Sequence, residues 1–158
     1  IMAGMHLHAD HRMWPSLLRL PSITRGDRAL AEEARRLMAF VNLGDYIDAD
    51  AAAMPYGALK RLEIARALAT RSKLMLLDEP AAGLNPAETQ AIDGLIQKIA
   101  ESGVTVILVE HDMRLVMGVS DHILVLESGR KLAEGTAEEI RHNKGVVAAY
   151  LGEQASGR

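Results

Sequence analysis

Residues 73–80 read K-L-M-L-L-D-E-P, and this stretch decides the fold of the chain. Four consecutive apolar residues run directly into Asp78 and Glu79. An unbroken apolar run of this length predicts a strand buried on both faces, as in a parallel sheet. Ligands of open α/β sheets bind beyond the carboxyl ends of the strands. Two carboxylates at that place indicate a divalent metal and an activated water, and ordinary surface acids are the alternative.

A helix and a second strand follow this first strand. Asn85 and Pro86 predict a helix start, with proline at the first helical position and Glu88 completing a capping box. Gly103 predicts the end of that helix. Residues 104–109 read V-T-V-I-L-V and predict a second buried strand. Four apolar residues are expected to line the buried face of the helix between the strands: Ile92, Leu95, Ile96 and Ile99.

Glu79 and His111 each come just after one of these two strands. A right-handed crossover brings the carboxyl ends of both strands to one edge of the sheet. We therefore expect the carboxylate pair and the imidazole of His111 to face one site.

The rest of the chain alternates between helical and strand patterns. Residues 1–71 are expected to form a helical subdomain, 72–135 part of an α/β core with a parallel sheet, and 136–158 a helical tail. Pro21 and Gly26 are expected to interrupt the chain, and Ser128-Gly129 predicts a hairpin turn. Helices are expected over 28–42, 59–70, 112–119, 136–141 and 145–151, strands over 122–127 and 131–133, and a loop over 44–53.

The composition excludes several classes of protein. The net charge is −3, with 18 basic and 21 acidic residues, so it offers no electrostatic basis for binding nucleic acid. The chain has no cysteine, which rules out disulfides and thiol chemistry. No apolar run approaches the roughly 18 residues of a membrane span. We expect a soluble intracellular protein.

Taken in order along the chain, these motifs resemble the ATP-binding subunit of an ABC transporter. The resemblance implies that Asp78 holds Mg²⁺ and that Glu79 is the general base acting on the attacking water. It also implies that His111 contacts the γ-phosphate of ATP. The implied fold is the P-loop NTPase fold of the ABC ATPases, α/β in class and incomplete in this chain. Nucleotide contacts are implied for two further segments, a signature loop just before a helix (Met54, Pro55, Tyr56, Gly57 and Ala58) and a loop at the dimer interface (Ala82, Gly83, Leu84 and Asn85).

Several of these motifs are similar to those of the branched-chain amino acid importers: P-Y-G, D-E-P-A-A-G-L-N-P, V-E-H-D and the C-terminal A-A-Y-L-G. That resemblance implies import of leucine, isoleucine and valine, with ATP and Mg²⁺ as cofactors. It implies a second ATPase subunit, identical or different, and membrane permease subunits as partners. A periplasmic binding protein would act indirectly. The subunit would lie peripherally on the cytoplasmic face of the inner membrane.

The chain departs from the family pattern in two ways. Pro55, Tyr56 and Ala58 stand where many signature loops carry serine, glycine and glutamine. The phosphate-binding sequence G-x-x-x-x-G-K-[ST] is also absent. We therefore interpret the chain as the C-terminal fragment of an ATPase, almost inactive alone and with an exposed sheet edge.

Other functions remain open from the sequence. An ABC ATPase serving urea import or lipopolysaccharide export would share the histidine and a similar C-terminal tail, whereas the A-A-G-L-N-P loop and the P-Y-G signature favour amino acids. A non-catalytic module with a degenerate NTPase fold would explain the missing phosphate loop, although Asp78, Glu79 and His111 are all present. A DNA-repair ATPase would need long coiled-coil heptads, which the sequence lacks. His6, His8 and His11 could form a metal site or be ordinary solvated or packed side chains.

Overall fold

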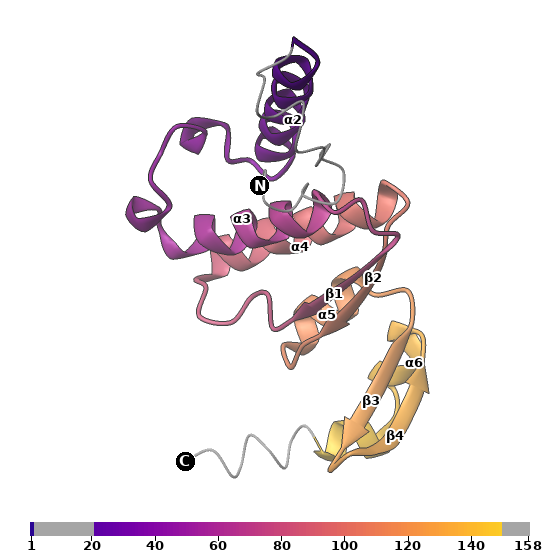
Figure 1. Ribbon diagram of the computed structural model, residues 1–158. Helices are drawn as coiled ribbons and strands as arrows, with labels where there is room; N and C mark the ends of the chain where they lie inside the picture. The colour runs from indigo at the N-terminus through magenta and orange to yellow at the C-terminus, as the bar shows by residue number, and fades with distance from the viewer. Residues whose placement is uncertain (2–20, 150–158) are drawn as a thin grey trace. The chain divides into compact units, whose positions relative to one another are not determined.

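The computed structural model describes residue 1 and residues 21–149 of the chain (Figure 1). These residues belong to two compact units, divided after Ile107, and each unit is described by itself below. Residues 144–149 are helical as well. The elements are α2 (Pro21–Phe40), the short 3₁₀ helices η2 (Gly44–Tyr46) and η3 (Ala51–Ala53), α3 (Tyr56–Leu68), β1 (Leu74–Asp78), α4 (Pro86–Glu101), β2 (Thr105–Val109), α5 (Met113–Val119), β3 (Ile123–Glu127), β4 (Arg130–Gly135) and α6 (Ala137–Arg141).

Strands β1 and β2 pair with each other, and α4 connects them. The backbone N–H of Thr105 donates to the carbonyl of Lys73 at 2.9 Å. Thr105 begins β2, and Lys73 directly precedes β1. Because the two strand starts pair, the strands run parallel, which confirms the predicted β–α–β unit.

Helix α4 begins as the sequence predicts. The Asn85 side chain accepts the N–H groups of Ala87 and Glu88, each at 3.0 Å, and Glu88 accepts the N–H of Asn85 at 3.1 Å. This capping box, with Pro86 at the first position, fixes where the helix starts. Gly103 follows with a φ of +90°, which glycine adopts without strain. The predicted apolar face is buried: Ile92, Leu95, Ile96 and Ile99.

Two predicted boundaries near the N-terminus are wrong. Helix α2 begins at Pro21, seven residues before the predicted start, because proline is tolerated in the first helical turn. Helix α3 begins at Tyr56 rather than at Leu59, with Pro55 as its N-cap. Tyr56, Gly57 and Ala58 therefore form the first turn of α3 and do not precede it as a loop. The predicted loop 44–53 contains η2 and η3.

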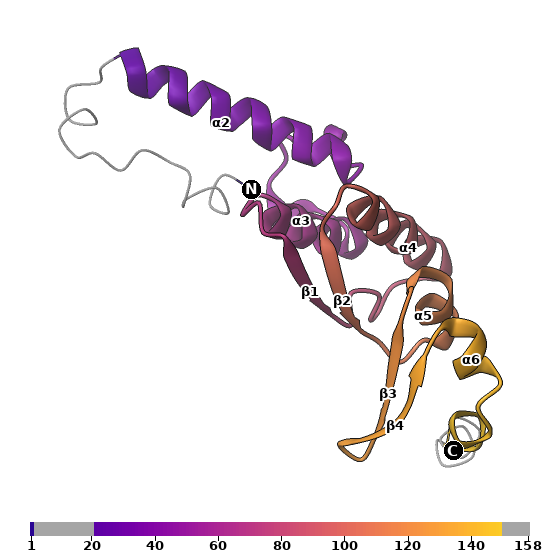
Figure 2. The same cartoon turned by 90° about the vertical axis from the view of Figure 1, so that its right-hand side faces the viewer.

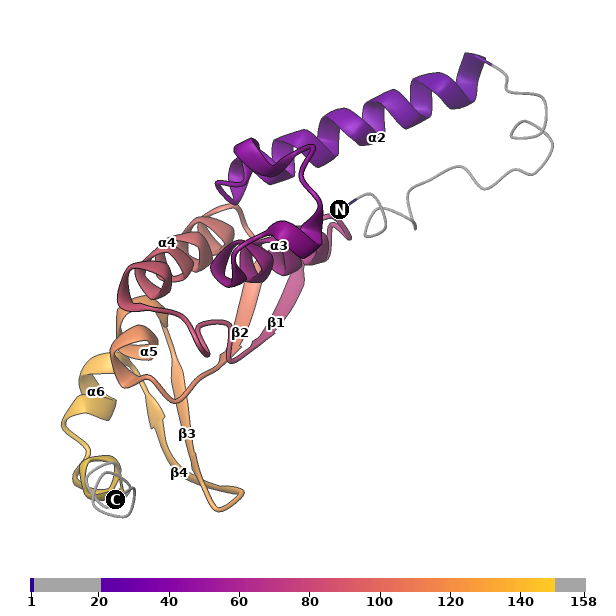
Figure 3. The same cartoon turned by 90° about the vertical axis from the view of Figure 1, so that its left-hand side faces the viewer.

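The prediction that both strands are buried on both faces is also wrong. Helices α3 and α4 lie on one side of the β1–β2 pair (Figures 1 and 3). Side chains alternate between the two faces of a strand, so Leu77 is 9% exposed and its neighbour Leu76 is 70% exposed. In β2, Ile107 is half exposed. An unbroken apolar run predicts a strand with two apolar faces, and here the described residues cover one of them.

The second unit contains the hairpin β3–β4 and helix α6 beside it (Figure 2). Ser128 and Gly129 connect the strands with φ of +49° and +75°, as expected of a tight hairpin turn. A capping box between Thr136 and Glu139 starts α6 and confirms that prediction. One buried apolar cluster of this unit consists of Ile123, Ala133, Ile140 and Val146.

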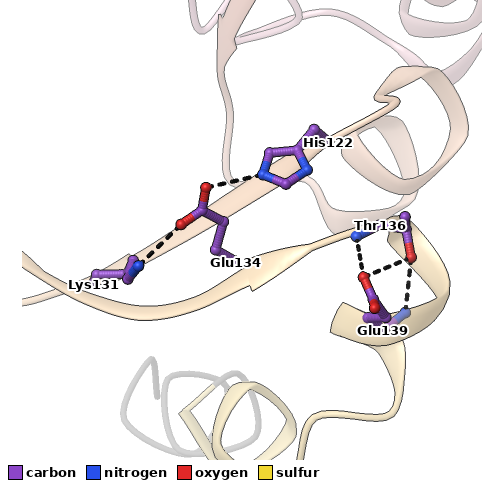
Figure 4. A network of polar contacts seen from close by, with 5 residues as sticks. All are labelled: His122, Lys131, Glu134, Thr136 and Glu139. Carbon is purple, nitrogen blue, oxygen red and sulfur yellow. Dashed lines mark hydrogen bonds and ion pairs between the residues drawn. The ribbon is translucent and has the colours of Figure 1, made fainter.

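A polar network lies on the exposed face of the hairpin (Figure 4). One oxygen of Glu134 lies 3.0 Å from His122 Nε2, and the other accepts from Lys131 Nζ at 3.0 Å. These hydrogen bonds, first that of His122 and then that of Lys131, lower the pKa of Glu134 below its ordinary value, and the charge of Lys131 adds to the effect.

The alternating burial of β1 gives a matched pair of substitutions. We expect Leu77→Ala to lower the free energy of unfolding by about 2–4 kcal/mol, because it opens a cavity in the core. Leu76→Ala removes the same atoms from an exposed position and should cost less than about 1 kcal/mol. Urea unfolding of the two variants measures both values. Equal losses would contradict the one-sided burial of β1.

The network around Glu134 predicts a pH dependence of hairpin stability. A carboxyl whose pKa is lowered on folding stabilises the fold above its unfolded pKa, and the contribution is lost as the pH falls through the folded value. We therefore expect the thermal midpoint of the wild type to fall more steeply than that of Glu134→Gln when the pH drops below about 4.5, the ordinary pKa of the group. Glu127→Gln, at another exposed carboxylate of this hairpin, should keep the wild-type slope. Identical slopes in the wild type and Glu134→Gln would refute this stabilisation.

Candidate functional site

The predicted acids lie at the carboxyl end of β1. Asp78 is the last residue of the strand, and its side chain is exposed. Glu79 follows with a φ of +44°, in the left-handed region, and precedes Pro80. Few residues other than glycine adopt this conformation, which costs about 1–2 kcal/mol. Backbone strain of this kind clusters at functional sites, so it supports the choice of Glu79 as a candidate.

The loop from Glu79 to Asn85 is built from short turns. The N–H of Ala82 donates to the carbonyl of Glu79 at 3.1 Å, and that of Leu84 donates to the carbonyl of Ala81 at 3.2 Å. Gly83 lies between them with a φ of +76°. Asn85 then caps α4. The predicted interface loop thus runs without a break from the strained strand end into the helix cap.

The structure brings two predicted segments together within the first unit. A Cβ added to Gly83 would lie 3.3 Å from Cε1 of the Tyr56 ring. The Tyr56 ring is therefore packed against the backbone of the loop 82–85. Lys60 Nζ lies 5.7 Å from the centre of the same ring, within reach of a cation–π interaction. Met54 and Ala58 are buried, so they support the segment from inside.

His111 belongs to the second unit, two residues beyond β2. Its side chain is 77% exposed, whereas that of Glu110 is only 2% exposed. Glu110 accepts the backbone N–H of His111 at 3.2 Å, and its carboxylate lies 3.8 Å from His111 Nδ1. The expectation that His111 and Glu79 face one site stays a prediction.

Asp112 caps helix α5 immediately after His111. Its side chain accepts the N–H groups of Arg114 at 2.9 Å and Leu115 at 3.5 Å. Burial alone would raise the pKa of Asp112, but these hydrogen bonds and the charge of Arg114 outweigh it and lower the pKa. The cap fixes the start of α5 and so the backbone that follows His111.

The described residues fit a metal ion that is held partly by the protein and partly by water and nucleotide phosphates. Among residue 1 and residues 21–149, no group of three or more His, Cys, Asp or Glu side chains could hold a metal ion. Mg²⁺ does not need such a cage, because it is bound through one or two carboxylates together with water and substrate phosphates. Asp78 supplies a carboxylate of this kind. The three histidines that could form a metal site or be ordinary side chains (His6, His8 and His11) lie outside the described residues.

The sequence reasoning missed two residues, one beside a candidate site residue in each unit. Glu88 was recognised only as a helix cap, yet its carboxylate also lies against Gly57 of α3. Glu110 is a buried carboxylate beside His111. The sequence shows an acid directly before the candidate histidine, although it does not show that this acid is buried. The approach of Glu88 to Gly57 was not, because the two lie far apart along the chain.

The backbone at Glu79 can be tested apart from its side chain. We expect Glu79→Gly to be more stable than Glu79→Ala by about 1 kcal/mol, because glycine adopts the left-handed conformation without strain. At Asp78, in extended backbone, the order should reverse, with glycine less stable than alanine by about 0.5–1 kcal/mol. Urea unfolding of the four variants gives both differences. The same order at both positions would contradict the strained conformation of Glu79.

Two family models match parts of the sequence. The family described as "ABC transporter" matches residues 5–82. The family described as "Branched-chain amino acid ATP-binding cassette transporter" matches residues 130–156, which include β4 and α6. Among the described residues, no helix is both long and apolar enough to cross a membrane.

Individual relatives match along nearly the whole chain. The chain is 45% identical over 97% of its length to the high-affinity branched-chain amino acid transport ATP-binding protein BraF of Pseudomonas aeruginosa, and it covers 60% of that protein. It is 40% identical, with the same coverage, to LivG of Escherichia coli, which carries the same description. The chain therefore spans about 60% of the length of these curated relatives.

Solved structures match in fold. The ADP conformation of MJ1267, an ATP-binding cassette of an ABC transporter, superposes with a TM-score of 0.74 at 26% identity. That match covers 96% of this chain and 62% of the other. A nucleotide-free ATP-binding cassette from an ABC transporter superposes with a TM-score of 0.73 at 26% identity over 94% of this chain and 61% of its own. In sequence and in fold this chain is similar to the ATP-binding cassettes of ABC transporters, and its residues 130–156 match the branched-chain amino acid family of these cassettes.

Proposed function

We propose that this chain is part of an ATP-hydrolysing subunit that energises the import of branched-chain amino acids. The observation that carries the proposal is the 45% identity to BraF over 97% of the chain. Residues 130–156 also match the branched-chain amino acid family, which supports the same substrate class. The expected division into segments 1–71, 72–135 and 136–158 is part of the proposal.

The acids at the end of β1 are assigned separate roles. Asp78 would hold Mg²⁺, which when bound neutralises charge on the nucleotide phosphates. Glu79 accepts a proton from the attacking water and so acts as the general base. Adjacent residues in extended and left-handed backbone fix these two carboxylates at one strand end. The strain at Glu79 is consistent with a position kept for function and not for stability.

The remaining site residues are assigned to nucleotide contacts. His111 contacts the γ-phosphate. The first turn of α3, preceded by Met54 and Pro55, presents backbone N–H groups and the positive end of a helix dipole to the nucleotide of a partner subunit. Pro55 offers no side-chain cap there, which leaves this end of α3 suited to an anion. Residues 82–85, packed against Tyr56, extend the same surface toward the partner subunit.

The proposed assembly rests on the same similarity to ABC transporter ATP-binding proteins. Two ATPase subunits, identical or different, would bind membrane permease subunits, and a periplasmic binding protein would deliver the substrate. The subunit would lie on the cytoplasmic face of the inner membrane. The phosphate-binding loop absent from this sequence would have to be supplied by further polypeptide, because phosphoryl transfer depends on it.

Gene replacement in the source organism tests the proposal. We expect deletion of the gene to reduce uptake of radiolabelled leucine at least tenfold, and the wild-type gene to restore it. Glu79→Gln should not restore uptake, because the amide cannot accept the proton from water. Glu127→Gln, at a carboxylate of the hairpin, serves as the matched control and should restore uptake fully.

The same strains distinguish the alternatives. Loss of urea uptake with normal leucine uptake would assign the ATPase to another substrate. Full rescue of leucine uptake by Glu79→Gln would show that Glu79 is not the general base. Unchanged uptake of both compounds in the deletion strain would overturn the transport proposal.

A further inference from the structure

The first turn of α3 and the N-terminus of α4 meet in the first unit through one carboxylate. Glu88 Oε1 lies 2.5 Å from the position that a Cβ would take on Gly57, and its Cδ lies 2.8 Å from that position. No real side chain fits at such a distance, so the absence of a side chain at Gly57 creates the space that Glu88 fills. Gly57 itself is buried, whereas Glu88 is partly exposed.

The other oxygen of the same carboxylate holds the loop 82–85. Glu88 Oε2 accepts the backbone N–H of Asn85 at 3.1 Å. The Asn85 side chain in turn accepts the N–H of Glu88 at 3.0 Å. The bond from the Asn85 N–H to Oε2 holds the Glu88 side chain, so moving the carboxylate away from Gly57 would break this half of the capping box of α4.

A second contact joins α3 to the loop 82–85. The ring of Tyr56, the residue before Gly57, packs 3.3 Å from the Cβ position of Gly83, two residues before Asn85. Two adjacent residues of α3 therefore contact the loop 82–85 and the start of α4, Tyr56 at Gly83 and Gly57 at Glu88. Two contacts fix the orientation of the first turn of α3 relative to the loop 82–85, whereas a single contact would allow the two segments to rotate about it.

We propose that Glu88 is a positioning residue that fixes the first turn of α3 against the loop 82–85, by filling the space at Gly57 while capping α4. The positioning role of Glu88 is independent of the proposed function. Only its expected effect on ATP hydrolysis rests on that function. Both segments are assigned there to the nucleotide of a partner subunit, so their relative position decides whether the two can bind it together. A general helix cap would stabilise α4 without coupling it to α3.

A double-mutant cycle in this chain tests the coupling. The variants are Gly57→Ala, Glu88→Ala and the two combined, and the readout is the ¹H–¹⁵N amide resonances of Gly83 and Asn85. We expect Gly57→Ala to shift both resonances, because the added methyl group displaces Glu88 from its cap. In the Glu88→Ala background the same methyl group meets no carboxylate, so the additional shift should fall at least fivefold.

Two further variants separate positioning from general stability. Gly94→Ala, in the helix α4 that Glu88 caps, places its Cβ where nothing lies within 4 Å, and it should leave the Gly83 and Asn85 resonances unchanged. Glu88→Gln keeps an oxygen that can accept the Asn85 N–H, so it should retain a wild-type-like pattern. Equal shifts from Gly57→Ala with and without Glu88 would overturn the proposal, as would an effect of Gly94→Ala equal to that of Gly57→Ala.

The catalytic consequence has its own readout in the protein that contains the phosphate-binding loop. We expect Glu88→Ala to lower kcat for ATP hydrolysis about tenfold with KM for ATP within twofold, and Glu88→Gln to recover most of it. A raised KM with unchanged kcat would overturn the positioning role. The resonance experiment uses the chain without nucleotide, so its result does not depend on the transport proposal. Failure of the positioning role and failure of the transport proposal can therefore be told apart.

Discussion

The cap at the start of α4 is the interaction on which the described site depends. Asn85 and Glu88 exchange hydrogen bonds at the point where the loop after β1 becomes a helix. The helix that starts there buries its apolar face and returns the chain to β2, parallel to β1. A parallel strand cannot pair with its neighbour without such a crossover. The cap therefore determines where the loop ends and where α4, the connection between β1 and β2, begins.

The loop before this cap stores strain that the cap helps to offset. Glu79 adopts a left-handed conformation, and Gly83 a second positive φ that glycine accepts freely. The hydrogen bond from the Ala82 N–H to the Glu79 carbonyl holds the first turn. With β1 at one end and the α4 cap at the other, the loop has little freedom to relax. The strained conformation of Glu79 is thus held in place by the contacts at both ends of the loop, as expected where strain serves a function.

Local patterns predicted most of the fold. Both capping boxes, the Ser128-Gly129 turn and the apolar face of α4 depend on residues within a few positions of one another. The start of α3 was missed because tyrosine and glycine are weak helix formers, and the structure places them in the first turn after Pro55. One-sided burial of β1 was missed for a different reason. An apolar run shows that two faces are apolar, and it does not show which faces other elements cover.

The site was predictable as residue types but not as contacts. Asp78, Glu79 and the loop 82–85 follow from the end of one strand, whereas the approach of Glu88 to Gly57 joins distant parts of the sequence. A carboxylate beside a proposed anion site appears unfavourable at first. A Cβ on Gly57 would project outward from the side of α3 with a tilt toward its N-terminus, however, while the N–H groups of a first helical turn point along its axis. Glu88 therefore flanks the turn and leaves its axial end to a phosphate, and its partly exposed charge is screened by solvent and salt. Fixing the turn from the side is thus compatible with binding an anion at its end.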